Sequence, residues 1–257
     1  MKSFPASPLR PRGDALAVLV VLGALMAGFI WLLWPEWRTN PDLSHAYFVP
    51  FLFVLLVSES RRQGPLRWLP PGGGATTAVV VTLAAGFAFF ALSGIFAATL
   101  AWTHAVVYAL LAAALASFLL AGLLILADVR LRLVPFNWIS LTAILLWLLV
   151  APLPDGTYAR LTLGLQQWIS GSVLHALHLL GIPARQHGNI IELARATVGV
   201  EEACSGIRSL LSCVFAGFFF AAWLVRRPLG RLVLIATAPL LALGMNFVRS
   251  LTLTLMA

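Results

Sequence analysis

The chain has 257 residues, of which 61% are hydrophobic and only 10% are charged. This composition excludes a soluble globular domain and indicates an integral membrane protein with several spans. The net charge of +8 rests almost entirely on arginine, but no basic stripe is interleaved with aromatic residues, so we expect no binding of nucleic acid.

Runs of apolar residues predict an all-α integral membrane protein, a bundle of about seven transmembrane helices that forms a single membrane domain over residues 1–257. The first run, 15–34, follows a polar leader and lacks a small-residue cleavage site, so we expect an uncleaved anchor. The other predicted spans are 45–58, 75–93, 105–127, 134–150, 206–225 and 232–248.

The segment 155–203 is the long stretch predicted to lie outside the membrane. Its first part, 158–180, predicts an amphipathic helix on the membrane surface. Its second part, 182–200, predicts a small β-hairpin around His187-Gly188-Asn189. The predicted apolar face of the helix comprises Leu161, Leu165, Trp168, Ile169, Val173, Leu177 and Leu180, opposite Gln166, Gln167 and Ser170.

The distribution of basic residues predicts how the bundle is oriented. Eleven of the 17 lysines and arginines fall on one side of the membrane if the N-terminus is cytoplasmic, and the positive-inside rule favours this orientation. His45, the segment 155–203 and the start of the sixth span then lie on the outer face. The cytoplasmic set is Lys2, Arg10, Arg12, Arg61, Arg62, Arg67, Arg130, Arg132, Arg226, Arg227 and Arg231.

One short stretch, Val-Glu-Glu-Ala-Cys-Ser-Gly-Ile-Arg-Ser-Leu at 200–210, combines a potential nucleophile, three charges and a helix start. A thiolate on Cys204 is favoured by the unpaired N–H groups and the dipole of a helix N-terminus, and Arg208 adds a cation one turn further on. The other cysteine, Cys213, is roughly 13 Å away along the same predicted helix, too far for a disulfide. An inert, packed Cys204 beside a surface arginine is the alternative that these residues leave open.

With these motifs, the chain resembles an exosortase, of the exosortase/archaeosortase family of multi-pass membrane cysteine transpeptidases, over residues 31–249. The resemblance rests first on Glu-Ala-Cys-Ser-Gly-Ile-Arg-Ser-Leu, which starts at Glu202, and on Asn-Phe-Val-Arg, which starts at Asn246. Further matches are Asp42-Leu43-Ser44-His45 leading to Val49-Pro50, Pro152-Leu153-Pro154, and Leu165-Gln166.

The resemblance implies a cysteine protease or transpeptidase with Cys204 as nucleophile and Arg249 as the second catalytic residue. Its implied partners are substrate proteins with a C-terminal sorting signal, that is, a Pro-Glu-Pro-type motif, a transmembrane helix and a basic tail, together with the lipid bilayer. The implied location is the inner membrane of exopolysaccharide-producing Gram-negative bacteria, with the active site on the periplasmic side. No cofactor or metal is expected. Arg208, Glu202, Asn246 and His45 are the expected supporting residues.

The family pattern has a third catalytic position, His or Arg, beyond the Asn-x-x-Arg arginine, whereas the sequence given ends at Ala257. Either the chain is a fragment, or it has lost the third residue, or another group supplies the acid, for which His45 and His187 are the candidates. His175 and His178 share a helix face, but no nearby Cys, Asp or Glu completes a metal site.

Two other functions stay open at this point. One is a non-catalytic, degenerate or truncated exosortase-like assembly protein. The other is a small-molecule transporter, which the near absence of charged residues inside the predicted spans disfavours.

Overall fold

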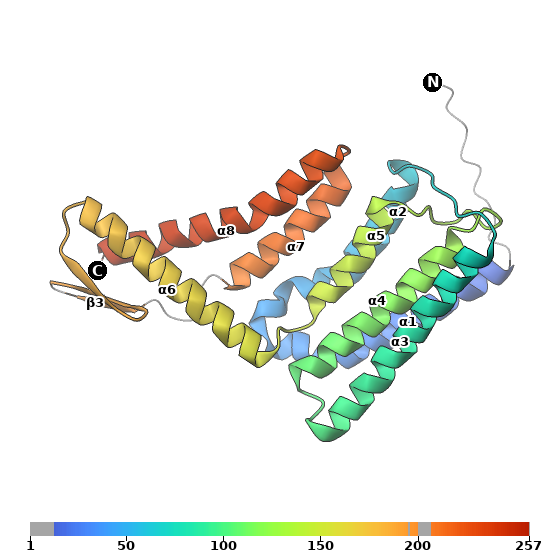
Figure 1. Cartoon of the computed structure of the whole chain (residues 1–257), viewed down its shortest axis with the longest axis horizontal. Coiled ribbons are helices and arrows are strands. Elements are labelled where there is room, and N and C mark those ends of the chain that lie inside the picture. The colour runs from blue at the N-terminus through green and yellow to red at the C-terminus, as the bar shows by residue number, and fades with distance from the viewer. Residues whose placement is uncertain (1–12, 195, 200–206, 257) are drawn as a thin grey trace.

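The computed structural model of the chain describes residues 13–194, 196–199 and 207–256 (Figure 1). Within these residues, 6 helices are long and apolar enough to cross a membrane, or up to 7 if one bent pair counts as a span. The predicted all-α, multi-pass class is confirmed. The helices are α1 (Gly13–Thr39), η1 (Pro41–Phe48), α2 (Val49–Arg62), α3 (Gly73–Thr99), α4 (Ala105–Leu126), α5 (Trp138–Leu145), η2 (Leu146–Val150), α6 (Asp155–Leu179), α7 (Ile207–Leu224) and α8 (Pro228–Met256), where η marks a 3₁₀ helix.

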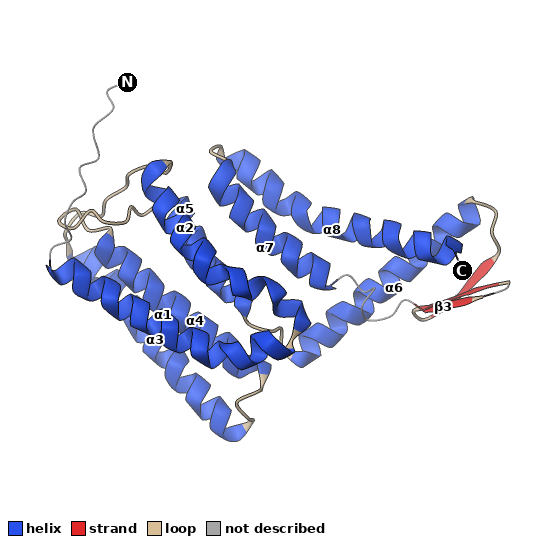
Figure 2. Ribbon diagram, turned by 180° about the vertical axis from the view of Figure 1, so that it is seen from behind, coloured by secondary structure: helices blue, strands red, loops and turns tan. Residues whose placement is uncertain are grey.

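Helix α4 forms the centre of the bundle. It has the largest buried share among the candidate spans, and Tyr108, Leu111, Leu115 and Leu119 all lie in the hydrophobic core. Figures 1 and 2 show α1 and α3 running alongside it. By contrast, α1, α3 and α8 bury only a small part of their apolar surface inside the protein. Such apolar outer surfaces are expected of helices that face lipid.

The fifth predicted span, 134–150, differs from the expectation. Its helical part consists of the 8-residue α5 and the 5-residue η2, whereas a membrane crossing takes about 20 residues. A bend of 92° separates this part from α6. Trp147 is completely buried and most of the segment packs against neighbouring helices, whereas Leu145 and Leu148 are exposed at the protein surface.

Although short, α5 and η2 run from one end of the bundle to the other. At the start of α5, the side-chain amide of Asn137 donates a hydrogen bond to the carbonyl of Ser60 at 3.0 Å, beside the end of α2. At the end of η2, the indole of Trp37 in α1 donates to the carbonyl of Val150 at 3.0 Å. The segment is therefore antiparallel to α2 and brings the chain back to the end at which α6 begins.

The loops that the charge pattern predicts to be cytoplasmic meet at one end of the bundle. Leu69 exchanges backbone hydrogen bonds of 2.9 and 3.0 Å with Ala127 and Val129, and the Arg231 guanidinium lies 5.8 Å from the Trp138 ring centroid. We call this end the arginine end; it carries Arg61, Arg62, Arg67, Arg130, Arg132, Arg226, Arg227 and Arg231. The grouping agrees with the predicted sidedness, and the cytoplasmic location of this end stays a prediction.

Helix α6 is present as predicted, but its buried face differs from the prediction. Gln166 and Ser170, assigned to the polar face, are buried, whereas Leu161, Trp168 and Leu180, of the apolar face predicted to lie on the membrane, are exposed at the protein surface. The reason is that α6 packs with Ile169, Val173 and Leu177 against the small sheet and against Phe247 and Leu251 of α8.

The predicted hairpin is confirmed and is extended by a third strand, to give an antiparallel sheet in the order β1-β2-β3. The strands are β1 (Ala184–His187), β2 (Ile190–Leu193) and β3 (Thr197–Gly199). His187 pairs with Ile190, so the turn has two residues, and its Gly188 has φ +64, which glycine adopts without strain. Figure 2 shows the sheet at the far end of α6, away from the bundle.

Candidate functional site

The candidate site lies at the end of the bundle opposite the arginine end, where α7 begins. Helices α7 and α8 form an antiparallel pair, and a β-carbon on Gly217 would come within 2.7 Å of the Ala238 β-carbon. From this contact, Ile207 lies about 15 Å back along α7 and Arg249 about 17 Å forward along α8. Both residues are thus at the same end of the pair, although Figure 1 shows the helices separating in that direction.

Of the two catalytic residues predicted from the sequence, the structure describes only Arg249. Cys204 lies outside the described residues, as do Glu202 and Glu201. Arg249 lies in α8 with an exposed side chain and has no ion pair within the described part of the chain. Its exposed guanidinium, unpaired within the described residues, can donate hydrogen bonds to an anionic group.

Arg208, in the first turn of α7, is held by an acidic residue from a distant part of the sequence. Its Nε donates to Oδ1 of Asp42 at 3.0 Å, and the pair forms a salt bridge across 166 positions of the sequence. The side chain of Asp42 is only 13% exposed, whereas that of Arg208 is 56% exposed. A pair of this kind stabilises a fold by about 0–1 kcal/mol, so its larger effect is on the orientation of the guanidinium.

A tyrosine from α6 occupies the second oxygen of the same carboxylate. The hydroxyl of Tyr158 donates to Oδ2 of Asp42 at 2.8 Å. Asp42 therefore links η1 with the first turns of both α6 and α7. The backbone of Asp42 is held in place as well. Its N–H donates to the side chain of Asn40 at 3.0 Å, and the Asn40 side chain in turn donates to Glu36 at 2.9 Å.

His45, the predicted candidate acid, lies one turn after Asp42 and is buried. Its Nε2 is 2.8 Å from the carbonyl oxygen of Leu149, and its ring centroid is 5.0 Å from that of Phe215 in α7. These contacts connect η1, η2 and α7 behind the Asp42–Arg208 pair. A role for His45 in proton transfer stays a prediction.

Asn246, another predicted supporting residue, is buried in α8 and has an interaction partner. Ser250 and Thr254 continue the same buried face at intervals of four residues. The Asn-x-x-Arg motif thus turns its asparagine toward the protein interior and its arginine toward the surface. This difference in burial fits a structural role for Asn246 and a ligand-facing role for Arg249.

The remaining histidines of the segment 155–203 do not converge on a common site. Nε2 of His178 lies 3.0 Å from the Ala184 carbonyl, which links α6 to β1, and His187 lies 3.7 Å from Glu192 on the exposed hairpin. Among the described residues, no group of three His, Cys, Asp or Glu side chains is placed to hold a metal ion.

Sequence reasoning missed the role of two residues at this site. Asp42 was noted only as part of the motif that ends in His45, and Tyr158 only as the start of the outer helix. The sequence did contain a signal for Asp42, because it is an acidic residue in a short polar motif just before an apolar run. No local signal identifies Tyr158, because its partner is 116 positions away.

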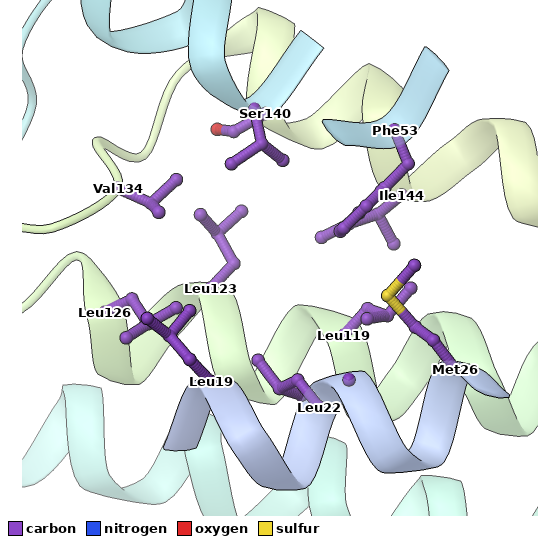
Figure 3. Close-up of a pocket in the computed structure, with 12 residues that line it drawn as sticks. Leu19, Leu22, Met26, Phe53, Leu119, Leu123, Leu126, Val134, Ser140 and Ile144 are labelled. Carbon is purple, nitrogen blue, oxygen red and sulfur yellow. The ribbon is translucent and has the colours of Figure 1, made fainter. Parts of the chain in front are cut away.

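A cavity of about 160 Å³ lies elsewhere, inside the bundle (Figure 3). Its walls are mainly apolar side chains of α1, α2, α4 and α5, among them Leu22, Met26 and Phe53. Its polar residue, Ser140, already donates to the Pro135 carbonyl at 2.8 Å. The cavity offers no chemistry for catalysis and is separate from the candidate site.

A family model described as transmembrane exosortase matches residues 37–257. Neither the curated proteins nor the solved structures give a match.

Proposed function

The chain belongs to the transmembrane exosortase family, and on this premise we propose that it is a membrane-embedded cysteine protease or transpeptidase. It cleaves exported proteins at a C-terminal sorting signal of the Pro-Glu-Pro type, followed by a transmembrane helix and a basic tail. Cleavage takes place at the outer face of the inner membrane. The family match, over most of the chain, is the observation that carries the proposal.

The chemistry assigns the nucleophile to Cys204. Its thiolate attacks the carbonyl carbon of the scissile amide, and the carbonyl electron pair moves onto oxygen. Collapse of this intermediate breaks the C–N bond, leaves a thioester on Cys204 and releases the amine, which takes a proton from a general acid. Water or another acceptor then attacks the thioester and regenerates the thiol.

Arg249 is suited to the oxyanion rather than to proton transfer. A guanidinium keeps its proton at any physiological pH, so it stabilises negative charge but cannot act as the acid. His45 is the first candidate for the acid. It lies one turn after Asp42 and packs against Phe215 of α7, the helix that carries Arg208.

The site also suits a substrate that is itself held in the membrane. The α7 helix starts at the end of the bundle opposite the arginine end, and a transmembrane substrate tail presents its scissile bond at the membrane surface. A basic substrate tail would then lie on the cytoplasmic side, in agreement with the positive-inside rule.

The test is to express the full chain with a reporter protein that carries such a tail and to measure release of the shortened reporter. Cys204→Ser should abolish release while the amount of enzyme stays unchanged. Cys213→Ser is the matched control and should have no effect, because Cys213 lies further along α7, where a thiolate in lipid is too costly to form. Release that survives Cys204→Ser would contradict the proposal, and a chain that binds the tail without cleaving it would have a non-catalytic role.

A further inference from the structure

We propose that Asp42 is a positioning residue that fixes the guanidinium of Arg208 for the reaction at the start of α7. This inference rests on the proposed function. It starts from the direct contact between Arg208 Nε and Asp42 Oδ1 at 3.0 Å, which joins two segments that the sequence separates by 166 positions.

The contact uses one of the five N–H donors of Arg208. Within the part of the chain that the structure describes, the guanidinium makes no other hydrogen bond. The four terminal N–H donors therefore have no partner among the described residues, and the Arg208 side chain is more than half exposed. An arginine held through Nε presents its terminal donors as a planar fork, the geometry that fits a carboxylate or a developing oxyanion.

The carboxylate itself is held more firmly than a surface acid would be. The Tyr158 hydroxyl occupies its second oxygen at 2.8 Å, and the Asn40 side chain accepts the Asp42 backbone N–H at 3.0 Å. From the next turn of η1, His45 contacts the Leu149 carbonyl at 2.8 Å. A group that is supported on several sides in this way can fix its partner's orientation.

Without Asp42, the long side chain of Arg208 would sample many rotamers at the protein surface. Fixing one of them removes an entropic cost from each catalytic cycle, because the fork is already oriented when the substrate arrives. Asp42 need not touch the substrate for this purpose. It acts through Arg208, so the effects of changing the two residues should not be independent.

The test uses the full chain in the reporter assay, with Asp42→Asn, Arg208→Ala and the double variant. Asp42→Asn keeps the size of the side chain but removes its charge. We expect kcat to fall about 10-fold, with KM and the amount of folded enzyme unchanged. In the Arg208→Ala background, Asp42→Asn should cause no further loss. Asp42→Glu, which retains the charge, should keep more activity than Asp42→Asn.

Asp155→Asn is the matched control, since Asp155 is an exposed acid in the first turn of α6 and should tolerate the change. Three outcomes would overturn the inference: wild-type kcat for Asp42→Asn, a loss that multiplies fully with that of Arg208→Ala, or a loss matched by an equal drop in folded enzyme. Processing that is abolished by Cys204→Ser but unaffected by Asp42→Asn would overturn this inference alone. Processing that survives Cys204→Ser would overturn the proposed function and, with it, this inference.

Discussion

Gly217 of α7 lies directly against Ala238 of α8, so that a β-carbon at position 217 would approach the Ala238 β-carbon to 2.7 Å. The contact brings the two helices together halfway between the arginine end and the candidate site. From this contact the two helices separate toward the end that carries Arg249 and the start of α7 (Figure 1).

Gly217→Val should weaken this helix pair, because the added side chain has no room without a shift of α8. We expect a loss of about 1–3 kcal/mol in the free energy of unfolding. The measurement is the thermal unfolding midpoint of the purified chain in detergent. Gly244→Val is the control, because nothing lies within 4 Å of a β-carbon at Gly244. Equal unfolding midpoints for the two variants would show that the contact does not limit the packing.

Asn137→Ala should destabilise the arginine end. The Asn137 side chain caps α5 by accepting the N–H groups of Ile139 and Ser140 at 3.0 and 3.1 Å, and it donates to the Ser60 carbonyl at 3.0 Å. Removing these buried partners should cost about 1–3 kcal/mol. Ser58→Ala, which removes an exposed hydroxyl in α2, should be close to neutral in the same unfolding measurement. A neutral Asn137→Ala would contradict the assigned capping role.

The surroundings of Gly217 and Asn137 illustrate how much of the fold could be predicted from the sequence. Hydropathy identified the apolar segments, because a run of about 20 apolar residues is a strong local signal. It did not distinguish the short α5 and η2 from a full span, since an apolar side chain such as Trp147 looks the same whether protein or lipid surrounds it. Asn137, which fixes the start of α5, is one of three polar residues inside such a run, beside Ser140 and Thr142.

Individual residues of the candidate site could be named from the sequence, but the contacts between them could not. The motif at 200–210 identified Arg208 from its charge beside a predicted helix start, whereas Arg249 was named only because 246–249 resembles an exosortase motif. The partner of Arg208 was not predictable, because Asp42 belongs to another element and its pairing is a long-range property of the fold. The burial of Gln166 and Ser170 was missed for the same reason: periodicity gives the faces of α6 but not which face its neighbours cover.

The orientation of the bundle predicts which surfaces a water-soluble reagent can reach. In a chain whose two cysteines are replaced by serine, His187→Cys should be labelled from outside intact cells, whereas Pro228→Cys should be labelled only after the membrane is opened. Both positions are exposed in the structure, so labelling should depend on sidedness alone. The reverse pattern would place the candidate site in the cytoplasm and would contradict the proposed function.

Arg249→Lys should lower the rate of processing by at least about 10-fold, because a point charge cannot replace a planar fork of donors that faces an oxyanion. The measurement is the initial rate of reporter release at equal amounts of enzyme. Arg160→Lys, an exposed arginine in α6, is the matched control and should keep the wild-type rate. A wild-type rate for Arg249→Lys would remove Arg249 from the oxyanion role.

The central claim is that Cys204 forms a covalent bond with the substrate, and mass spectrometry of the acid-quenched enzyme–substrate mixture tests it most directly. The account predicts a thioester between Cys204 and the N-terminal substrate fragment, which hydroxylamine releases and which is absent from Cys204→Ser. Cleavage of the substrate with the fragment attached to Cys213 or to any other residue would contradict the account.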